Sequence, residues 1–258
     1  DHCRPARNGG FARAPAPVTL GASLQFVWRR IRRVVPAYWF QIACLLVIST
    51  GLATLPDWRM VVSHLLFLQN FSEQFAYALN GVYWTLPTEF GFYLLLPAIA
   101  WLAWRMRRGD SRSWLWLCLV LVGFSVVWRF IAFQGVADQP VGKRVFALMQ
   151  LPGLIDHFAI GILFAWGFIE AQRAGCPITG RLSDALTVLG LLGMVMVMAF
   201  FEVIYEQYWD GHPYLFVGYS LTALCMGAFI VGTAGGGRVS QALFGNPLAV
   251  TLGLISYS

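Results

Sequence analysis

The sequence predicts an all-α fold, a polytopic transmembrane helix bundle. Of its 258 residues 58% are hydrophobic and only 12% are charged, whereas soluble globular chains carry about 25% charged residues. Apolar runs of about 20 residues, the length that crosses a hydrocarbon core, recur along the chain with short arginine clusters between them. A soluble enzyme or binding domain is therefore excluded. Because such clusters are typical of cytoplasmic membrane loops, the net charge of +6 does not indicate a nucleic-acid partner.

Six complete spans and a partial seventh follow from these runs. The spans are expected at residues 37–55, 87–104, 113–133, 151–169, 184–205 and 214–233, and a further apolar run opens at Leu248. Residues 1–22, rich in proline, glycine and arginine, are expected to form a cytoplasmic linker before a transmembrane domain at 23–258. The apolar stretch 58–71 is too short to cross a bilayer and is expected to form an interfacial or re-entrant helix.

The basic residues set the expected orientation. If the spans alternate, the clusters at 29–33 and 105–112 and the arginines at 173, 181 and 238 fall on one side, and few basic residues fall on the other. Since positively charged loops stay inside the cell, we expect the N-terminus in the cytoplasm. Residues 235–237, three glycines, then form a cytoplasmic loop that is expected to be a flexible link and not a phosphate cradle.

Four arginines precede the first expected span. On a helix Arg30 and Arg33 share one face, and Arg29 pairs with Arg32 and Arg33. Guanidinium groups bind phosphate through two parallel hydrogen bonds, so this cluster can hold the phosphates of a cytosolic donor. The alternative is a topology signal that also touches anionic lipid head groups.

A second polar group lies at the start of the second span. Thr85 is expected to cap that helix and Glu89 to lie in its first turn, where the helix dipole favours a carboxylate. Glu89 and Tyr93 are four residues apart and share a face. Glu89 can act as a general base or orient one; the alternative is a capping carboxylate among interfacial aromatic rings.

Other polar residues of the apolar runs are expected to be structural. Asp156 and His157 are expected to form interhelical hydrogen bonds in preference to a catalytic role. Arg129 is expected to reach outward and anchor its helix, and His64 to lie at the membrane interface. The histidines and cysteines show no spacing typical of a metal site, so no metal is expected.

Together these segments resemble the acyltransferase family 3 membrane proteins. The resemblance covers residues 26–258, and family segments on both sides, including a histidine regarded as catalytic, are expected to be missing. A looser match is the Asp-x-Phe-x-x-Gly stretch at 156–161, and residues 253–258 are similar to the start of the family's last conserved helix. The family's arginine and glutamate patterns are similar to Phe26, Arg29, Arg30, Arg33 and Pro36, and to Trp84, Thr85, Leu86, Glu89, Phe92, Tyr93 and Pro97.

The resemblance implies an O-acyltransferase of the bacterial inner membrane. Such an enzyme moves an acyl group, in the first place acetyl, from acyl-coenzyme A to a hydroxyl of a carbohydrate, a lipid-linked glycan or another surface or secreted acceptor. No permanently bound cofactor is implied. The implied site residues are Glu89, Tyr93 and Trp84 for catalysis and Arg29, Arg30 and Arg33 for the donor.

The span order adds an expectation about distance. With the arginines at the cytoplasmic face and Glu89 at the outer end of its span, much of a hydrocarbon core about 30 Å thick separates the two groups. Either the bundle encloses a polar channel, or a re-entrant segment at 58–84 places Glu89 deeper than the span count suggests. Two alternatives to the acyltransferase remain. One is a transporter or flippase-like bundle with Glu89, Asp156 and Arg129 along a substrate path, and the other is a catalytically inactive remnant.

Overall fold

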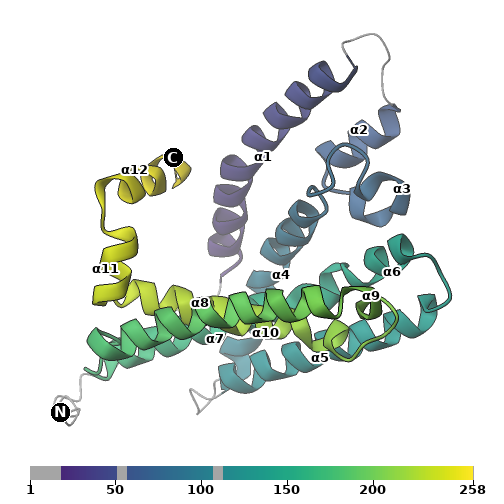
Figure 1. The fold of residues 1–258 in the computed structure, drawn as a ribbon. Coiled ribbons are helices and arrows are strands. Elements are labelled where there is room, and N and C mark those ends of the chain that lie inside the picture. Colours follow the sequence, from purple (N-terminus) through teal and green to yellow (C-terminus); the bar gives the residue numbers. More distant parts are fainter. Residues whose placement is uncertain (1–18, 51–56, 107–112, 258) are drawn as a thin grey trace. The chain divides into compact units, whose positions relative to one another are not determined.

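A computed structural model describes residues 19–50, 57–106 and 113–257. These residues form helices and no strand, which confirms the predicted fold class. They divide into two compact units (Figure 1). The N-terminal unit holds the described residues up to 114 together with 132–154, and the C-terminal unit holds 115–131 and 155–257. Residues 1–18 of the expected linker, and 107–112 of the second arginine cluster, lie outside the described residues.

The N-terminal unit is built around two long helices. They are α1 (Leu20–Thr50) and α4 (Thr85–Met106). Shorter elements complete the unit: α2 (Trp58–Leu65), η1 (Gln69–Phe71), α3 (Glu73–Ala76) and α6 (Val141–Leu148). Both ends of α5 (Ser113–Val136) and the first turn of α7 (Leu151–Arg173) also belong to this unit.

Helix α1 begins well before the first expected span at 37–55. The part of α1 suited to cross a membrane is Leu20–Ile48, and it contains the arginine cluster. The difference has a simple cause: arginine is a good helix former, so the cluster continues the helix where an apolar-run criterion sees an end. Pro36 also lies inside the helix without ending it.

Aromatic packing holds α1 against the segment that leads into α4. The ring of Tyr38, which is almost fully buried, lies 4.9 Å from the ring of Phe67 and 5.2 Å from that of Tyr83. Ile42 joins the same buried cluster. Because Tyr38 meets Tyr83 while residues nearer the start of α1 meet residues further along α4, the two helices run antiparallel.

The apolar stretch 58–71 does not form one helix. Helix α2 ends at Leu65, and Phe67 takes a φ of 59° before the short η1 turn. His64, expected at the membrane interface, is fully buried among other residues of this unit. Its Nδ1–H donates to the Met60 carbonyl at 2.9 Å, and burial lowers the pKa of the ring below its usual value.

The C-terminal unit contains four long helices and three short ones. The long ones are α5 (Ser113–Val136), α7 (Leu151–Arg173), α8 (Gly180–Val203) and α10 (Tyr214–Ala234). The short ones are α9 (Tyr205–Tyr208), α11 (Arg238–Phe244) and α12 (Pro247–Tyr257). The expected spans from the third onward agree with these helices, and the second agrees with α4, to within a few residues at each end.

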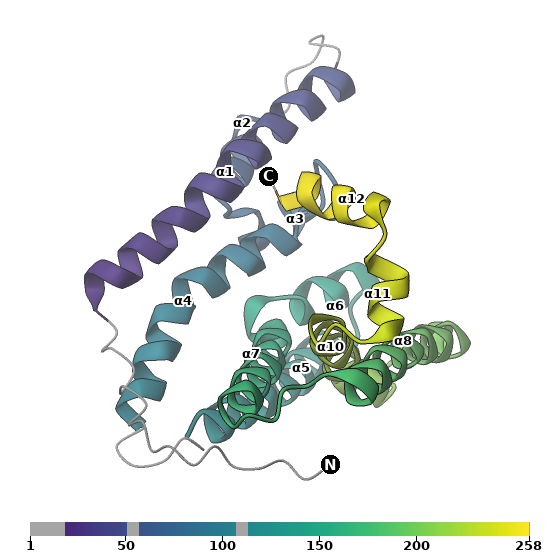
Figure 2. The same cartoon turned by 90° about the vertical axis from the view of Figure 1, so that its left-hand side faces the viewer.

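Helices α8 and α10 pack antiparallel with their backbones in close approach, and they lie side by side in both ribbon views (Figure 2). A Cβ added at Gly190 of α8 would stand 2.5 Å from the backbone nitrogen of Phe229 and 2.7 Å from the carbonyl of Cys225. Small residues at such crossings are the usual means by which membrane helices associate, since lipid supplies no hydrophobic drive between them.

The turn after α10 is tightly packed, so the expectation of a flexible link at 235–237 is wrong. Ser183 Oγ donates to the Gly232 carbonyl at 2.7 Å and accepts from the Gly237 N–H at 2.8 Å. Asp184 Oδ1 accepts from the Val239 N–H at 2.8 Å. Gly236 has a φ of 67°, a value that favours glycine. The glycines are therefore needed for a close turn onto α8.

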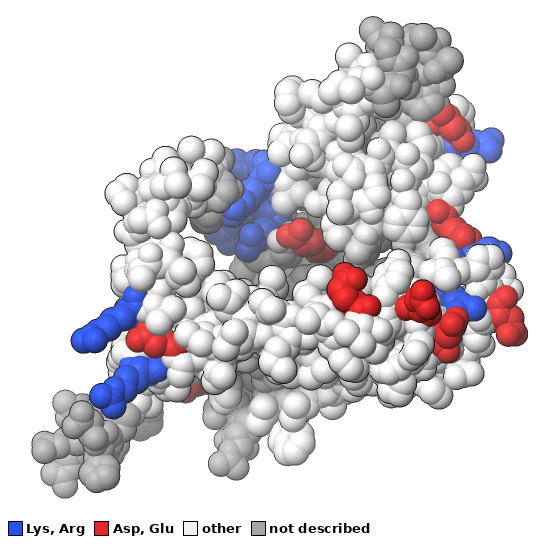
Figure 3. Space-filling view, in the orientation of Figure 1, with Lys and Arg blue, Asp and Glu red and all other residues white. Residues whose placement is uncertain are grey.

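Within the described residues six helices are long and apolar enough to cross a membrane. Their exposed faces are apolar; on α8 they include Leu189, Leu192 and Met196, each more than half exposed. Between Asp184 and Glu202 this helix has no charged residue. On the face seen in Figure 3, blue and red side chains lie toward the two ends of the α8 region and leave its middle uncharged. This is the distribution that a surrounding bilayer requires.

Candidate active site

The start of α4 places Glu89 differently from the prediction. Thr85 is the first helical residue, and its hydroxyl donates to the Val82 carbonyl at 3.0 Å, so it does not cap the helix. Glu89 consequently lies in the second turn, and the expectation of a capping carboxylate in the first turn is wrong. The helix starts earlier because Val82, Trp84 and their neighbours already form consecutive turns that lead into it.

Asn70 fixes the entry into α4 from the side of η1. Its Nδ2 donates to the Trp84 carbonyl at 2.7 Å and to Thr88 Oγ1 at 3.3 Å. Thr88 is itself buried. The hydrogen bond from Asn70 thus fixes the backbone of Trp84, five residues before Glu89.

Glu89 and Tyr93 form a hydrogen-bonded pair on one face of α4. The Tyr93 hydroxyl donates to Glu89 Oε1, as their spacing of four residues predicts. Both side chains are half-buried. The carboxylate therefore has one partner from its own helix and remains partly open.

Arg30 of α1 completes this group. Its guanidinium carbon lies 5.0 Å from the centre of the Tyr93 ring and 5.4 Å from that of Phe26. The Phe26 and Tyr93 rings also meet edge to face, 6.2 Å apart. Arg33 acts electrostatically on Tyr93 as well. Arg30, Tyr93 and Glu89 thus make one continuous contact between α1 and α4, which we call the arginine–glutamate cluster.

The cluster overturns the expected separation of the arginines from Glu89. That expectation came from counting the arginines before the first span and Glu89 at the far end of the second. Since α1 includes the arginines and runs antiparallel to α4, Arg30 comes level with Tyr93, one turn from Glu89. No passage across a hydrocarbon core is needed between them.

The other predicted site residues lie beside this cluster. Arg29 and Arg33 are exposed on α1, and Trp84 lies in the turn before α4. A cavity of about 450 Å³ lies on the opposite face of α4, lined there by Pro87, Gly91 and Leu94, with further apolar residues from η1 and from the start of α7. At 100° per residue these three positions point away from Glu89, and none of Arg30, Glu89 and Tyr93 lines the cavity, so the cavity is separate from the cluster.

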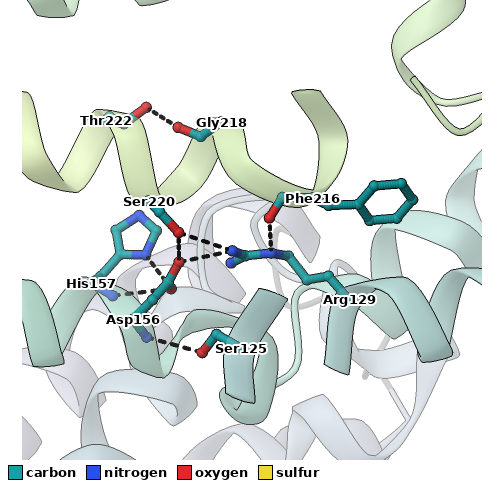
Figure 4. A network of polar contacts seen from close by, with 8 residues as sticks. All are labelled: Ser125, Arg129, Asp156, His157, Phe216, Gly218, Ser220 and Thr222. Carbon is teal, nitrogen blue, oxygen red and sulfur yellow. Dashed lines mark hydrogen bonds and ion pairs between the residues drawn. The ribbon is translucent and has the colours of Figure 1, made fainter. Parts of the chain in front are cut away.

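A second polar group is buried in the C-terminal unit (Figure 4). Arg129 of α5 and Asp156 of α7 are both fully buried, and Arg129 Nη2 donates to Asp156 Oδ2 at 2.8 Å. Arg129 also donates to Ser220 Oγ of α10 at 3.1 Å and to the Phe216 carbonyl at 2.9 Å. The expectation that Arg129 reaches outward is therefore wrong, because a carboxylate on the neighbouring helix satisfies its charge within the bundle.

Asp156 draws three helices together. The Ser220 hydroxyl of α10 donates to Asp156 Oδ2 at 2.5 Å. The backbone N–H of Asp156 donates to Ser125 Oγ of α5 at 3.0 Å. The interhelical hydrogen bonding expected of Asp156 is confirmed. Ser125 and Ser220 could not be singled out from the sequence, since serine is common in membrane helices and no spacing marks these two.

The described residues contain no cluster of three or more histidine, cysteine, aspartate or glutamate side chains able to hold a metal ion.

Comparison with known proteins assigns the family. A family model described as an acyltransferase domain, that of acyltransferase family 3, matches residues 20–258, which is nearly the whole chain. No curated protein and no solved structure matches the chain. The matched region contains both the arginine–glutamate cluster and the six helices that can cross a membrane. The chain therefore belongs to acyltransferase family 3 and is a multi-pass membrane acyltransferase.

Proposed function

We propose that the chain transfers an acetyl group from acetyl-coenzyme A to a hydroxyl of a carbohydrate or lipid-linked glycan, or of another surface or secreted acceptor. The observation that supports this proposal is the arginine–glutamate cluster, in which the half-buried Glu89 carboxylate of α4 and the Arg30 guanidinium of α1 both contact Tyr93. Acyl transfer to an alcohol needs a base for the hydroxyl proton and a positive group for the oxyanion. The cluster offers both.

Glu89 is the proposed base. The acceptor oxygen attacks the thioester carbonyl carbon, the C–S bond breaks, and the hydroxyl proton passes to Glu89 and from there to the leaving thiolate. The hydrogen bond from Tyr93 orients the carboxylate, and Trp84, one turn earlier, would line the acceptor side.

Different arginines of α1 are proposed to bind different parts of acetyl-coenzyme A. The pantetheine arm separates the phosphates of coenzyme A from its thioester. A guanidinium in contact with the Glu89–Tyr93 pair would therefore bind near the thioester and not near the phosphates. We assign Arg30 to the thioester oxygen, where negative charge develops. Arg29 and Arg33, which are exposed on the same helix, are assigned to the phosphates.

The proposed setting is the plasma membrane of a bacterium with the N-terminus in the cytoplasm, where coenzyme A is available. It is supported by the gathering of arginines on one side of the alternating spans. A transporter has less support, because Arg129 and Asp156, which would have to line its path, are fully buried against one another.

The test separates the roles by kinetics. The chain and its variants are reconstituted in phosphatidylcholine liposomes with radiolabelled acetyl-coenzyme A, methyl glucoside serves as the acceptor probe, and alkali-labile acetyl ester is counted. Glu89→Gln should lower kcat by about 10²- to 10⁴-fold. Arg30→Met should lower kcat by about 10²- to 10³-fold. Arg33→Met should instead raise the KM for acetyl-coenzyme A by about tenfold or more.

Matched controls come from residues of the same type on the long helices, outside the cluster. Glu170→Gln removes an exposed glutamate of α7, and Arg105→Met removes an exposed arginine whose guanidinium lies 5.4 Å from the Trp101 ring. Both should transfer acetyl groups at the rate of the unchanged chain. If Glu89→Gln is no slower than Glu170→Gln, Glu89 is not the base; if Arg30→Met behaves like Arg105→Met, Arg30 has no role in the reaction.

A further inference from the structure

A second cavity lies at one end of the C-terminal unit, whereas the residues assigned to acyl transfer belong to the N-terminal unit. A cavity of about 290 Å³ lies between the end of α8, α9 and the first turns of α10, and His157 of α7 contributes to its wall. The His157 side chain is one-third exposed. The remaining polar wall consists of Tyr208, Tyr214, Tyr219 and Thr222.

The hydrogen bonds of His157 fix which ring nitrogen can bind a ligand. Nδ1 lies 3.1 Å from Asp156 Oδ1, and the other carboxylate oxygen is bound to Arg129. An aspartate in an ion pair has no hydrogen to donate, so Nδ1 carries a proton, and in the neutral ring Nε2 carries the lone pair. Figure 4 shows the second ring nitrogen of His157 turned away from Asp156.

Other polar groups of the cavity have also used their hydrogens within the protein. The Thr222 hydroxyl donates to the Gly218 carbonyl at 2.9 Å, and the Tyr214 hydroxyl donates to the Val197 carbonyl at 3.1 Å. Each hydroxyl oxygen keeps lone pairs that can accept. With His157 Nε2, the wall therefore offers at least three hydrogen-bond acceptors whose own hydrogens are already engaged.

The rest of the wall is uncharged and aromatic. The Tyr208 ring, almost fully buried, packs edge to face against Phe201 at 4.8 Å and lies 6.2 Å from the Tyr214 ring. Val197 and Met198 complete the apolar side. Such a wall excludes an ionic ligand, since burying a charge without a counter-charge is costly, and it offers flat apolar surfaces to C–H groups.

We propose that this cavity binds a neutral, hydroxyl-rich ligand of the size of one monosaccharide, which donates a hydrogen bond to His157 Nε2. The size follows from the volume: at roughly 30 Å³ for each water-sized group, 290 Å³ holds about ten. The hydroxyl class follows from the three acceptors on the wall whose own hydrogens are already engaged. The proposal goes beyond the proposed acyl transfer and does not depend on Glu89 or on the arginines of α1.

Binding is measured on the full chain in phosphatidylcholine nanodiscs by saturation-transfer NMR and calorimetry, without any acyl donor. The probes are methyl glucoside and its fully O-methylated form, which keeps the ring and its oxygens but has no hydrogen to donate. Methyl glucoside should bind and the O-methylated form should not. If both forms bind with equal affinity, the cavity does not select hydroxyl donors and the proposal is wrong.

Two variants test whether methyl glucoside binds in this cavity. His157→Phe keeps an aromatic ring and removes the acceptor, and Thr222→Val keeps the side-chain shape and removes the hydroxyl. Each should weaken methyl glucoside binding by about 2- to 12-fold, the value of one neutral hydrogen bond. His212→Phe, a change in the loop before α10 outside the cavity lining, serves as the control and should bind normally. Unweakened binding by both cavity variants would show that the sugar lies elsewhere and would overturn the proposal.

Discussion

Replacing Arg129 by methionine should destabilise the protein strongly, because it leaves the fully buried carboxylate of Asp156 without its counter-charge. Breaking a buried ion pair by removing one partner costs about 3–5 kcal/mol. Asp156 can escape the penalty by taking up a proton, which at pH 7 costs an ordinary aspartate about 4 kcal/mol. That alternative caps the loss, so we expect about 3–4 kcal/mol.

The assay is thermal unfolding of the purified protein in a neutral detergent. A loss of 3–4 kcal/mol corresponds to a Tm lower by about 6–16 °C for a chain of this length. Arg173→Met is the matched control, because Arg173 lies 2.9 Å from Glu170 in an exposed pair. Exposed pairs contribute at most about 1 kcal/mol, so the control should lower the Tm by no more than about 4 °C.

A double variant tests the cause of the loss. Adding Asp156→Asn to Arg129→Met removes the unpaired charge while keeping the side-chain shape, so the double variant should be more stable than Arg129→Met alone. Should Arg129→Met melt at the same temperature as Arg173→Met, or the added Asp156→Asn lower the Tm further, the ion pair would not have the structural role assigned to it.

Two further predictions concern packing and pH. Gly190→Ala should destabilise the α8–α10 contact, because the added Cβ would stand 2.5 Å from the Phe229 backbone; Gly167→Ala, whose Cβ would meet no atom within 4 Å, should be neutral or slightly stabilising in the same melting assay. The lowered pKa of buried His64 means that the unfolded chain binds a proton more readily than the folded one. Stability should therefore be full above the ordinary histidine pKa and fall by up to about 1.4 kcal/mol per pH unit below about pH 6.5. Denaturant unfolding at pH 7.5 and 5.5 checks this, and a His64→Gln variant with an unchanged pH response would contradict it.

The helices after the first could be predicted from the sequence because the length of an apolar run is set by the bilayer. The first could not, since the same criterion treats Arg29 to Arg33 as a boundary while the backbone continues through them as a helix. A hydropathy pattern reports which residues tolerate lipid. It does not report where a helix ends, and at α1 the two differ.

The candidate site was predictable only within each helix. The Glu89–Tyr93 hydrogen bond follows from a spacing of four residues. The contact of Arg30 with Tyr93 depends on the antiparallel packing of α1 on α4, which no local pattern contains. For the same reason Arg129 could be recognised as an unusual residue in an apolar segment, while its partner Asp156 could not be chosen without the bundle.

The two groups that contain arginine differ in what their charges can still do. Arg129 has a carboxylate, a hydroxyl and a carbonyl as acceptors and no exposure. A ligand that competed for this guanidinium would have to break a buried ion pair, which costs more than most single contacts return. Arg30 is half-buried, and its contacts in the described part of the chain are the faces of two aromatic rings, which leave in-plane N–H groups for an oxygen ligand. The same residue type thus stabilises the bundle at one position and is available for chemistry at the other, and the distinction rests on the partner each guanidinium has, not on its depth in the membrane.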